Sequence, residues 1–178
     1  MKKLIETSEY APYYSKYIND VPQGDIIDIL AQQNEETICL LQDISENQAH
    51  FRYAPEKWTL KEVIGHMADT EQIMGYRLLS IARGEIISLP GFNENEYVRN
   101  ASFNNQTVKA LIQNLSIIRQ STVHLLKSLT SEAWVRKGIA NNSEVTVRAL
   151  AYIIAGHELH HRKIITGRYI NSVEFPSS

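Results

Sequence analysis

The sequence predicts an all-α fold, specifically a four-helix bundle, and three observations support this prediction. Four long segments carry apolar residues spaced three and four positions apart, as on one face of a helix. Turn-forming residues separate these segments, and no segment shows the alternation of apolar and polar residues that is typical of a strand. The chain has 178 residues, enough for one domain with its own core, so residues 1–178 are interpreted as a single domain.

The first two helices are predicted from about Asp25 to Ser45 and from about Thr59 to Arg83. The apolar face of the first is interrupted in its middle by Asn34 and Thr37, so this helix is apolar at both ends and polar at its centre. The second begins with Thr59-Leu-Lys-Glu62, which has the form of a capping box. Its start is therefore well defined by local chemistry.

The third and fourth helices are predicted from about Gln106 to Leu129 and from about Thr146 to Arg168. The third has one of the clearest amphipathic patterns in the chain. The fourth repeats the same spacing, but His157 and His161 occupy two positions of its apolar face. Helices of roughly 20–24 residues are about 30–36 Å long, which is typical of a helix bundle.

The link between the second and third helices, about Gly84 to Asn105, is long for a compact domain and contains Pro90-Gly91. When extended, a segment of this length covers more than the height of the bundle. We therefore expect a long crossover that returns the chain to its starting end and makes these two helices parallel. The leader, residues 1–22, is rich in tyrosine and is expected to pack across one end of the bundle.

The composition excludes several classes of protein. Lys and Arg number 18 and Asp and Glu number 20, for a net charge of -2, and no block of like charge offers nucleic acid a basic face. No apolar stretch is long enough to cross a bilayer, and no secretory signal follows the N-terminal lysines.

The single cysteine, Cys39, excludes an internal disulfide and a cysteine metal cluster, and we expect it to be a buried packing residue. A cytoplasmic protein without nucleic-acid or membrane partners is expected.

Two histidines of the fourth helix are candidate metal ligands. His157 and His161 are four residues apart, about 40° from one another around the helix axis, so both rings can project toward one point. They continue the apolar face that faces the interior, whereas His160 falls on a flank and is assigned to the rim or to a supporting position. A buried imidazole pair can share a cation or form an ordinary hydrogen-bonded pair, and both interpretations fit this spacing.

His66, in the second helix, strengthens the metal interpretation. It lies beside the apolar face, on the flank that carries Val63, Thr70 and Ile73. Taken alone, such a histidine fits a packing role, but a facing helix with two interior histidines favours a third ligand. Three neutral imidazoles leave coordination positions open, as a Lewis-acid centre requires. Imidazole suits several divalent ions, of which zinc or nickel is expected here.

Two segments resemble the signature segments of the DinB/YfiT-like superfamily, and the order of elements agrees over nearly the full chain. They are Trp58-Thr-Leu-Lys-Glu-Val-Ile-Gly-His66-Met-Ala-Asp69 and Gly156-His157-Glu-Leu-His-His161-Arg162. The resemblance implies a four-helix bundle with a long crossover and a divalent metal held by His66, His157 and His161. It also implies a metal-dependent enzyme, with hydrolysis or S-transfer of a small thiol as the activities ascribed to the family.

The sequence departs from the family pattern at one point. Many members continue the second motif with Gly-Gln after the arginine, whereas this chain has Arg162-Lys163-Ile164. The implied metal ligands are unaffected by this change. Any role of that glutamine has no counterpart here.

A cation at the three histidines would activate a water or a small thiol by lowering its pKa. Glu62 is the nearest candidate to orient His66 or to accept a proton, although its place in the capping box gives it a structural role as well. Asp69 and Glu71 are interpreted as supporting residues, as partners of a neighbouring helix, or as surface residues. Glu158 is expected to point outward, about 100° from its neighbour His157.

The expected partner is a small-molecule substrate that enters at the end covered by the long link. Asn93, Asn95 and Tyr97 of that link can contact it, or the link can serve only to return the chain. The alternative to an enzyme is a non-catalytic, metal-stabilised bundle that binds a ligand, and a homodimer formed through outer helix faces is compatible with either. With an ordinary histidine pKa of about 6.5, a three-imidazole site is expected to release its metal toward about pH 5.

Overall fold

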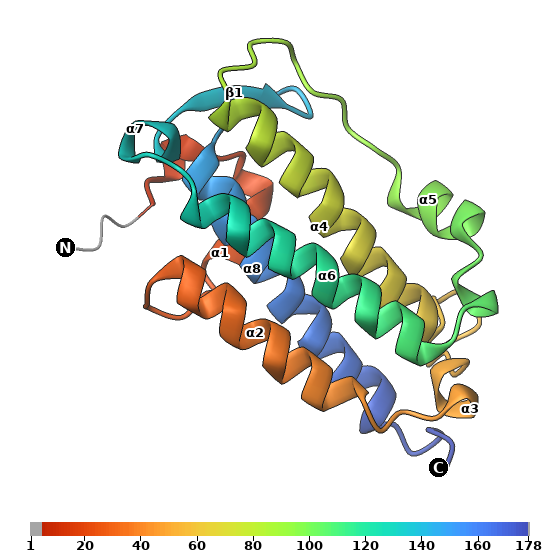
Figure 1. Ribbon diagram of the computed structural model, residues 1–178. Helices are drawn as coiled ribbons and strands as arrows, with labels where there is room; N and C mark the ends of the chain where they lie inside the picture. The colour runs from red at the N-terminus through yellow and green to blue at the C-terminus, as the bar shows by residue number, and fades with distance from the viewer. Residues whose placement is uncertain (1–4, 178) are drawn as a thin grey trace.

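Four long helices form the framework of the computed structural model, which describes residues 5–177 (Figure 1). They are α2 (Ile26–Leu41), α4 (Leu60–Ala82), α6 (Val108–Lys127) and α8 (Val147–Ile164). Each begins where a polar side chain accepts hydrogen bonds from the first turn, at Asp25, Thr59, Thr107 and Thr146. The predicted four-helix bundle is therefore confirmed. No helix in the described range is both long and apolar enough to span a membrane.

Helices α4 and α6 run in the same direction. Their first turns share the carboxylate of Glu46, which pairs with Lys61 Nζ at 2.6 Å and accepts from Val108 N at 2.8 Å. Near the middle of the same helices, Arg119 donates to Glu71. The connecting chain accordingly travels the length of the bundle, from the end near the hairpin to the end near α5 (Figure 1).

Several short elements complete the fold, and most lie in segments where the sequence predicts only turns. They are the α-helices α1 (Ser15–Ile18), α3 (Glu46–Ala49), α5 (Glu94–Ala101) and α7 (Ser131–Trp134), the 3-10 turns Thr7–Glu9, Pro12–Tyr14 and Phe103–Asn105, the π-helical turn Ile165–Ile170, and the strands β1 (Lys137–Ala140) and β2 (Ser143–Thr146).

The prediction of no strand is wrong for β1 and β2, which form an antiparallel hairpin. Each strand has only four residues, too few for a visible alternation of apolar and polar side chains. The turn between them holds Asn141 and Asn142, both with positive φ, as a two-residue hairpin turn requires. The Asn-Asn pair was the signal that sequence reasoning overlooked.

The leader extends further along the bundle than predicted, while residues 1–4 lie outside the described range. Glu9 lies at the start of α8, where it accepts from Thr146 Oγ1 and pairs with Arg148. The chain then continues to the middle of α8, where a Cβ on Gly156 would lie 2.2 Å from the Tyr17 carbonyl oxygen. Only glycine permits this close approach, so Gly156 positions the leader next to the histidines.

A buried ion cluster joins three of the long helices and is hydrogen-bonded to the fourth. Arg119 of α6 is bonded to Glu71 of α4 and Glu158 of α8, and it also donates to the Leu30 carbonyl oxygen of α2 at 3.0 Å. Burial opposes the charge on Arg119, but the two carboxylates outweigh this effect and raise its pKa. Thr37, in the polar centre of α2, donates to Glu158. The polar middle of α2 thus meets the polar residues of its neighbours.

Two predictions about single side chains are wrong. Glu158 does not point outward but is buried, because it faces Arg119 of α6 and Thr37 of α2 inside the bundle. Cys39 is not buried but exposed. It lies about 200° around α2 from the buried Thr37, on the side of the helix that faces away from the bundle.

Candidate metal centre

Three histidine rings from two antiparallel helices converge between α4 and α8. His66 Nε2 lies 3.2 Å from His157 Nε2, which lies 3.1 Å from His161 Nε2. One nitrogen of each ring lies within 4.8 Å of the other two. The structure therefore brings together the three histidines singled out in the sequence.

The environment of the rings fixes their orientation. Thr70 Oγ1, one helical turn after His66, lies 3.5 Å from the His66 Nδ1, and Trp58 packs on the same ring with centroids 4.7 Å apart. Tyr17 of the leader packs edge-on against His157 at 5.7 Å. A hydrogen-bond partner for the second ring nitrogen and side chains packed against the ring are typical of metal-binding histidines.

Burial keeps these imidazoles neutral. It lowers the pKa of His66 to about 4 and that of His161 to about 3, with neighbouring histidines acting in the same direction. The pKa of His157 is also well below its ordinary value, for the same two reasons. Neutral imidazole is the form that binds a metal, so no proton has to be removed at neutral pH.

The donor set fits a cation better than it fits hydrogen bonding alone. Each neutral imidazole has one N–H and one lone pair, so the single Nε2 of His157 can pair properly with only one of its two neighbours. A tetrahedral zinc ion with Zn–N bonds of about 2.0–2.1 Å separates its ligand nitrogens by about 3.3 Å, close to the distances found here. One ion would engage all three nitrogens at once.

The sequence model of the DinB superfamily matches residues 29–165, which hold all three histidines and nearly all of the four long helices. The chain belongs to the DinB superfamily.

Two solved structures are similar to this superfamily member. YfiT from Bacillus subtilis gives a TM-score of 0.74 at 17% identity, covering 89% of this chain and 90% of YfiT. It is described as a probable metal-dependent hydrolase with an unusual four-helix bundle topology. The DinB-like protein YjoA from Bacillus subtilis gives a TM-score of 0.59 at 19% identity, covering 86% of this chain and 97% of YjoA. At such identities the likeness establishes the fold. Comparison with curated protein sequences gives no match.

Two other candidate residues of this DinB-superfamily protein, Glu62 and His160, lie near the three histidines. Both carboxylate oxygens of Glu62 are engaged at the helix start, by Thr59 N at 2.7 Å and by Asn104 Nδ2 at 2.9 Å. No hydrogen bond joins Glu62 to His66 within the described part of the chain, so its observed contacts are those of a capping residue. His160 is half-buried at the rim, with its ring 5.2 Å from that of His161.

The two acidic residues that follow His66 on α4 also differ in their surroundings. Asp69 is half-buried, which raises its pKa, and it lines neither of the cavities next to the histidines. Glu71 is fully engaged with Arg119 on the neighbouring helix. In the described range, neither side chain forms a hydrogen bond or an ion pair with the three histidines.

Two cavities large enough for a small ligand flank the histidine cluster. His157 lies in the wall of one, of about 340 Å³, and His161 in the wall of the other, of about 240 Å³. Glu94 and Asn95 of the long link line both cavities, and Asn93 lines the first while it also caps α5. Tyr97 lines a different hollow, beside Tyr76 and away from the histidines. The link therefore covers the cluster mainly through residues 93–95.

Sequence reasoning missed several residues of these walls. Arg77 and the leader tyrosines Tyr13, Tyr14 and Tyr17 line the larger of the two cavities. For Arg77 a signal existed, because it follows His66 by three helical turns and shares its face of α4. For the leader there was none, since only folding brings it to α8.

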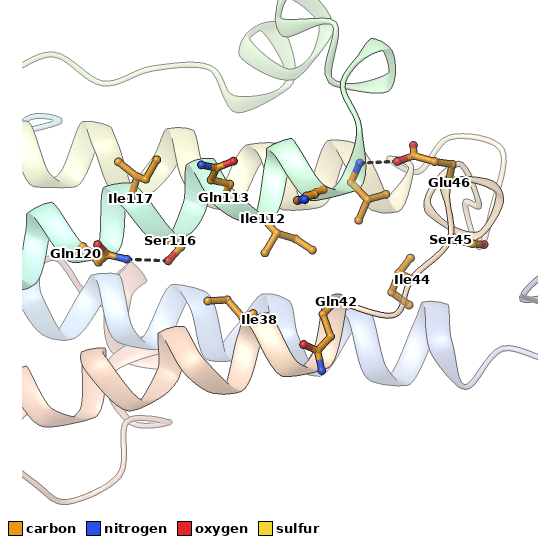
Figure 2. Close-up of a pocket in the computed structure, with 12 residues that line it drawn as sticks. Ile38, Gln42, Ile44, Ser45, Glu46, Ile112, Gln113, Ser116, Ile117 and Gln120 are labelled. Atoms are coloured by element: carbon orange, nitrogen blue, oxygen red, sulfur yellow. Dashed lines mark hydrogen bonds between the residues drawn. The ribbon is translucent and has the colours of Figure 1, made fainter.

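The bundle has a larger hollow at the opposite edge, between α2 and α6 (Figure 2). Its volume is about 810 Å³, and aliphatic and amide side chains such as Ile38, Ile112 and Gln113 form much of its wall. No histidine lines it. The candidate metal ligands therefore line the smaller cavities and not this larger one.

Proposed function

We propose that this protein is a metal-dependent enzyme in which His66, His157 and His161 hold a divalent cation that activates a water or a small thiol for hydrolysis or S-transfer. The observation that carries the proposal is the convergence of three neutral ring nitrogens from α4 and α8. Zinc and nickel are the proposed ions, because both accept imidazole ligands readily.

A divalent cation with three imidazole ligands and open coordination positions lowers the pKa of a water or thiol and so supplies a nucleophile near neutral pH. The histidines contribute their Nε2 lone pairs. Thr70 is suited to accept the Nδ1 proton of His66 and so to fix its tautomer. The cavities beside His157 and His161 provide room for a small-molecule substrate.

The description of YfiT supports hydrolysis as one of the two reactions. No carboxylate contacts the imidazoles in the described structure, and Glu94 is the acidic side chain that lines both flanking cavities. Glu94 is therefore proposed, ahead of Glu62, as a group that can accept a proton from the substrate side. Its side chain is exposed, and the capping hydrogen bonds of α5 are accepted by Asn93 rather than by Glu94.

The metal content of untagged protein tests the first half of the proposal. We expect about one zinc or nickel ion per chain in the wild type and none in His66→Ala, His157→Ala or His161→Ala. His124→Ala, which removes an exposed histidine of α6, is the matched control and should retain the metal. A wild-type protein without stoichiometric metal, or a His161→Ala variant that keeps it, would refute the proposed site.

Turnover tests the second half. Metal-loaded protein is supplied with an ester and amide panel, and separately with a small thiol and an electrophile. Metal-dependent product formation that disappears in the three alanine variants supports an enzyme. A loaded protein that converts none of these compounds but gains thermal stability from them would instead be a ligand-binding bundle.

A further inference from the structure

Arg77 is a buried cation without a buried counter-charge. Its residue is 3% exposed, and no carboxylate of the described chain lies within salt-bridge distance of it. The guanidinium donates through Nη2 to the Pro90 carbonyl oxygen at 2.6 Å, and Nη1 contacts Met74 Sδ at 3.5 Å. Its other neighbours, the Tyr14 side chain and the Phe92 ring at 6.0 Å, are also uncharged. Burying a charge without an ion-pair partner is costly. The contrast is Arg119, which is equally buried but pairs with two carboxylates.

The position of Arg77 relates it directly to the histidine cluster. It follows His66 by eleven residues, which places both on the same side of α4, within about 20°. Their Cα atoms are therefore about 16 Å apart along the axis. The contact with Met74, three residues earlier, shows that the arginine side chain leans back toward the histidines. Arg77 and His157 lie in the wall of the same cavity, of about 340 Å³.

The rest of that cavity offers mostly neutral hydrogen-bonding groups. Three tyrosines of the leader and three asparagines line it, the latter at positions 93, 95 and 141. The acidic residue in the wall, Glu94, is exposed, so water screens its charge much more than that of Arg77. The buried charge in the wall of this cavity is therefore the positive charge of Arg77, which lies at a distance from the histidines.

We propose that Arg77 binds the carboxylate of a small organic anion whose reacting group lies several bonds away, at the histidine cluster. A guanidinium has five N–H donors, and its planar fork matches a carboxylate. The inference rests on the proposed function for the role of the histidines, and it adds the substrate class. Substrates would be anionic thiols, esters or amides rather than neutral ones.

Mercapto acids of two to eight carbons, compared with their amides, test this pairing. Each is titrated by calorimetry into the metal-loaded protein. We expect the acid to bind at least tenfold more tightly than its amide at one preferred chain length, since a charge-assisted hydrogen bond contributes this much. Arg77→Gln, which removes the charge but keeps a polar side chain, should abolish the preference and leave metal content unchanged. Arg99→Gln, on the exposed face of α5, is the matched control and should keep it.

Two further arms separate this inference from the proposed function. Arg77→Lys keeps the charge and should retain part of the preference, which guards against a folding defect in the glutamine variant. Hexanoate and hexanamide are titrated into the metal-free His161→Ala protein, where a preference for hexanoate that depends on Arg77 supports the anion site even if metal binding fails. Equal affinities for acids and amides at every length, or a preference that survives Arg77→Gln, would overturn the proposal.

Discussion

The stability of the metal-free protein should fall steeply with acidification below pH 6.5, because folding keeps three imidazoles neutral. In the unfolded chain each histidine binds a proton with a pKa of about 6.5. In the folded protein the pKa is about 4 for His66 and about 3 for His161, and well below the ordinary value for His157. Between these values the unfolded state binds more protons, so stability is fully present above pH 6.5 and is lost as the pH falls.

The size of the effect follows from these pKa values. For a histidine that shifts from about 6.5 to about 4, the loss in the free energy of unfolding between pH 7 and pH 5 is about 2 kcal/mol. His66 and His161 together lose about 4 kcal/mol, a large part of the stability of an ordinary domain, and the lowered pKa of His157 adds to this loss. Near pH 5 the unfolded state binds about two more protons than the folded state at His66 and His161, which corresponds to a slope of about 3 kcal/mol per pH unit.

Urea unfolding in a chelator, at several pH values from 7 to 5, measures this slope. Replacing one ligand, as in His66→Gln, should reduce it by about one proton, whatever the variant does to absolute stability. His124→Gln removes an exposed histidine and should leave the slope of the wild type. Carboxylates that titrate in this range contribute equally to all three proteins and cancel in the comparison. A slope that is the same in wild type and His66→Gln would refute the claim that burial holds this ring neutral.

The same reasoning changes the expected pH of metal release. The sequence-based value of about pH 5 assumed an ordinary histidine pKa, but the folded ligands take up protons only near pH 4 or below. At pH 5 the metal should therefore stay bound for as long as the chain stays folded. Equilibrium dialysis at pH 5, followed together with circular dichroism, measures both quantities.

Two further predictions concern packing. Gly156→Ala should destabilise the protein by about 1–3 kcal/mol and weaken metal binding, because the new methyl group displaces the leader at Tyr17. Gly167→Ala, with open space around it, should be nearly neutral. Thermal melts and metal titrations measure both effects. Arg119→Ala should cost about 3–5 kcal/mol in urea unfolding, because it leaves two buried carboxylates unpaired, while Arg99→Ala in an exposed pair should change stability by less than about 1 kcal/mol. Equal effects within either pair would contradict the packing described here.

Local chemistry explains why the main helices could be predicted. The capping box predicted at Thr59 and Glu62 is present, and α4 ends at Ala82, one residue before the predicted limit. The first helix, by contrast, ends at Leu41 rather than Ser45. Ser45 instead caps the start of the short helix α3. Elements of four residues carry too few positions to show a period, so α3 and the hairpin escaped notice.

Through helical periodicity and capping, the sequence by itself determined the four helices and the faces on which His66, His157 and His161 stand. Only the tertiary structure decided that these faces meet, because His66 and His157 are 91 residues apart along the chain. It also buries Glu158 against Arg119 and places Arg77 in the wall of the cavity that His157 lines, without an ion-pair partner in the described chain. These outcomes depend on which side chains of neighbouring helices lie at the same level along the bundle axis. Burial, which lowers the pKa of the three histidines, is a property of that packing rather than of any local stretch of sequence.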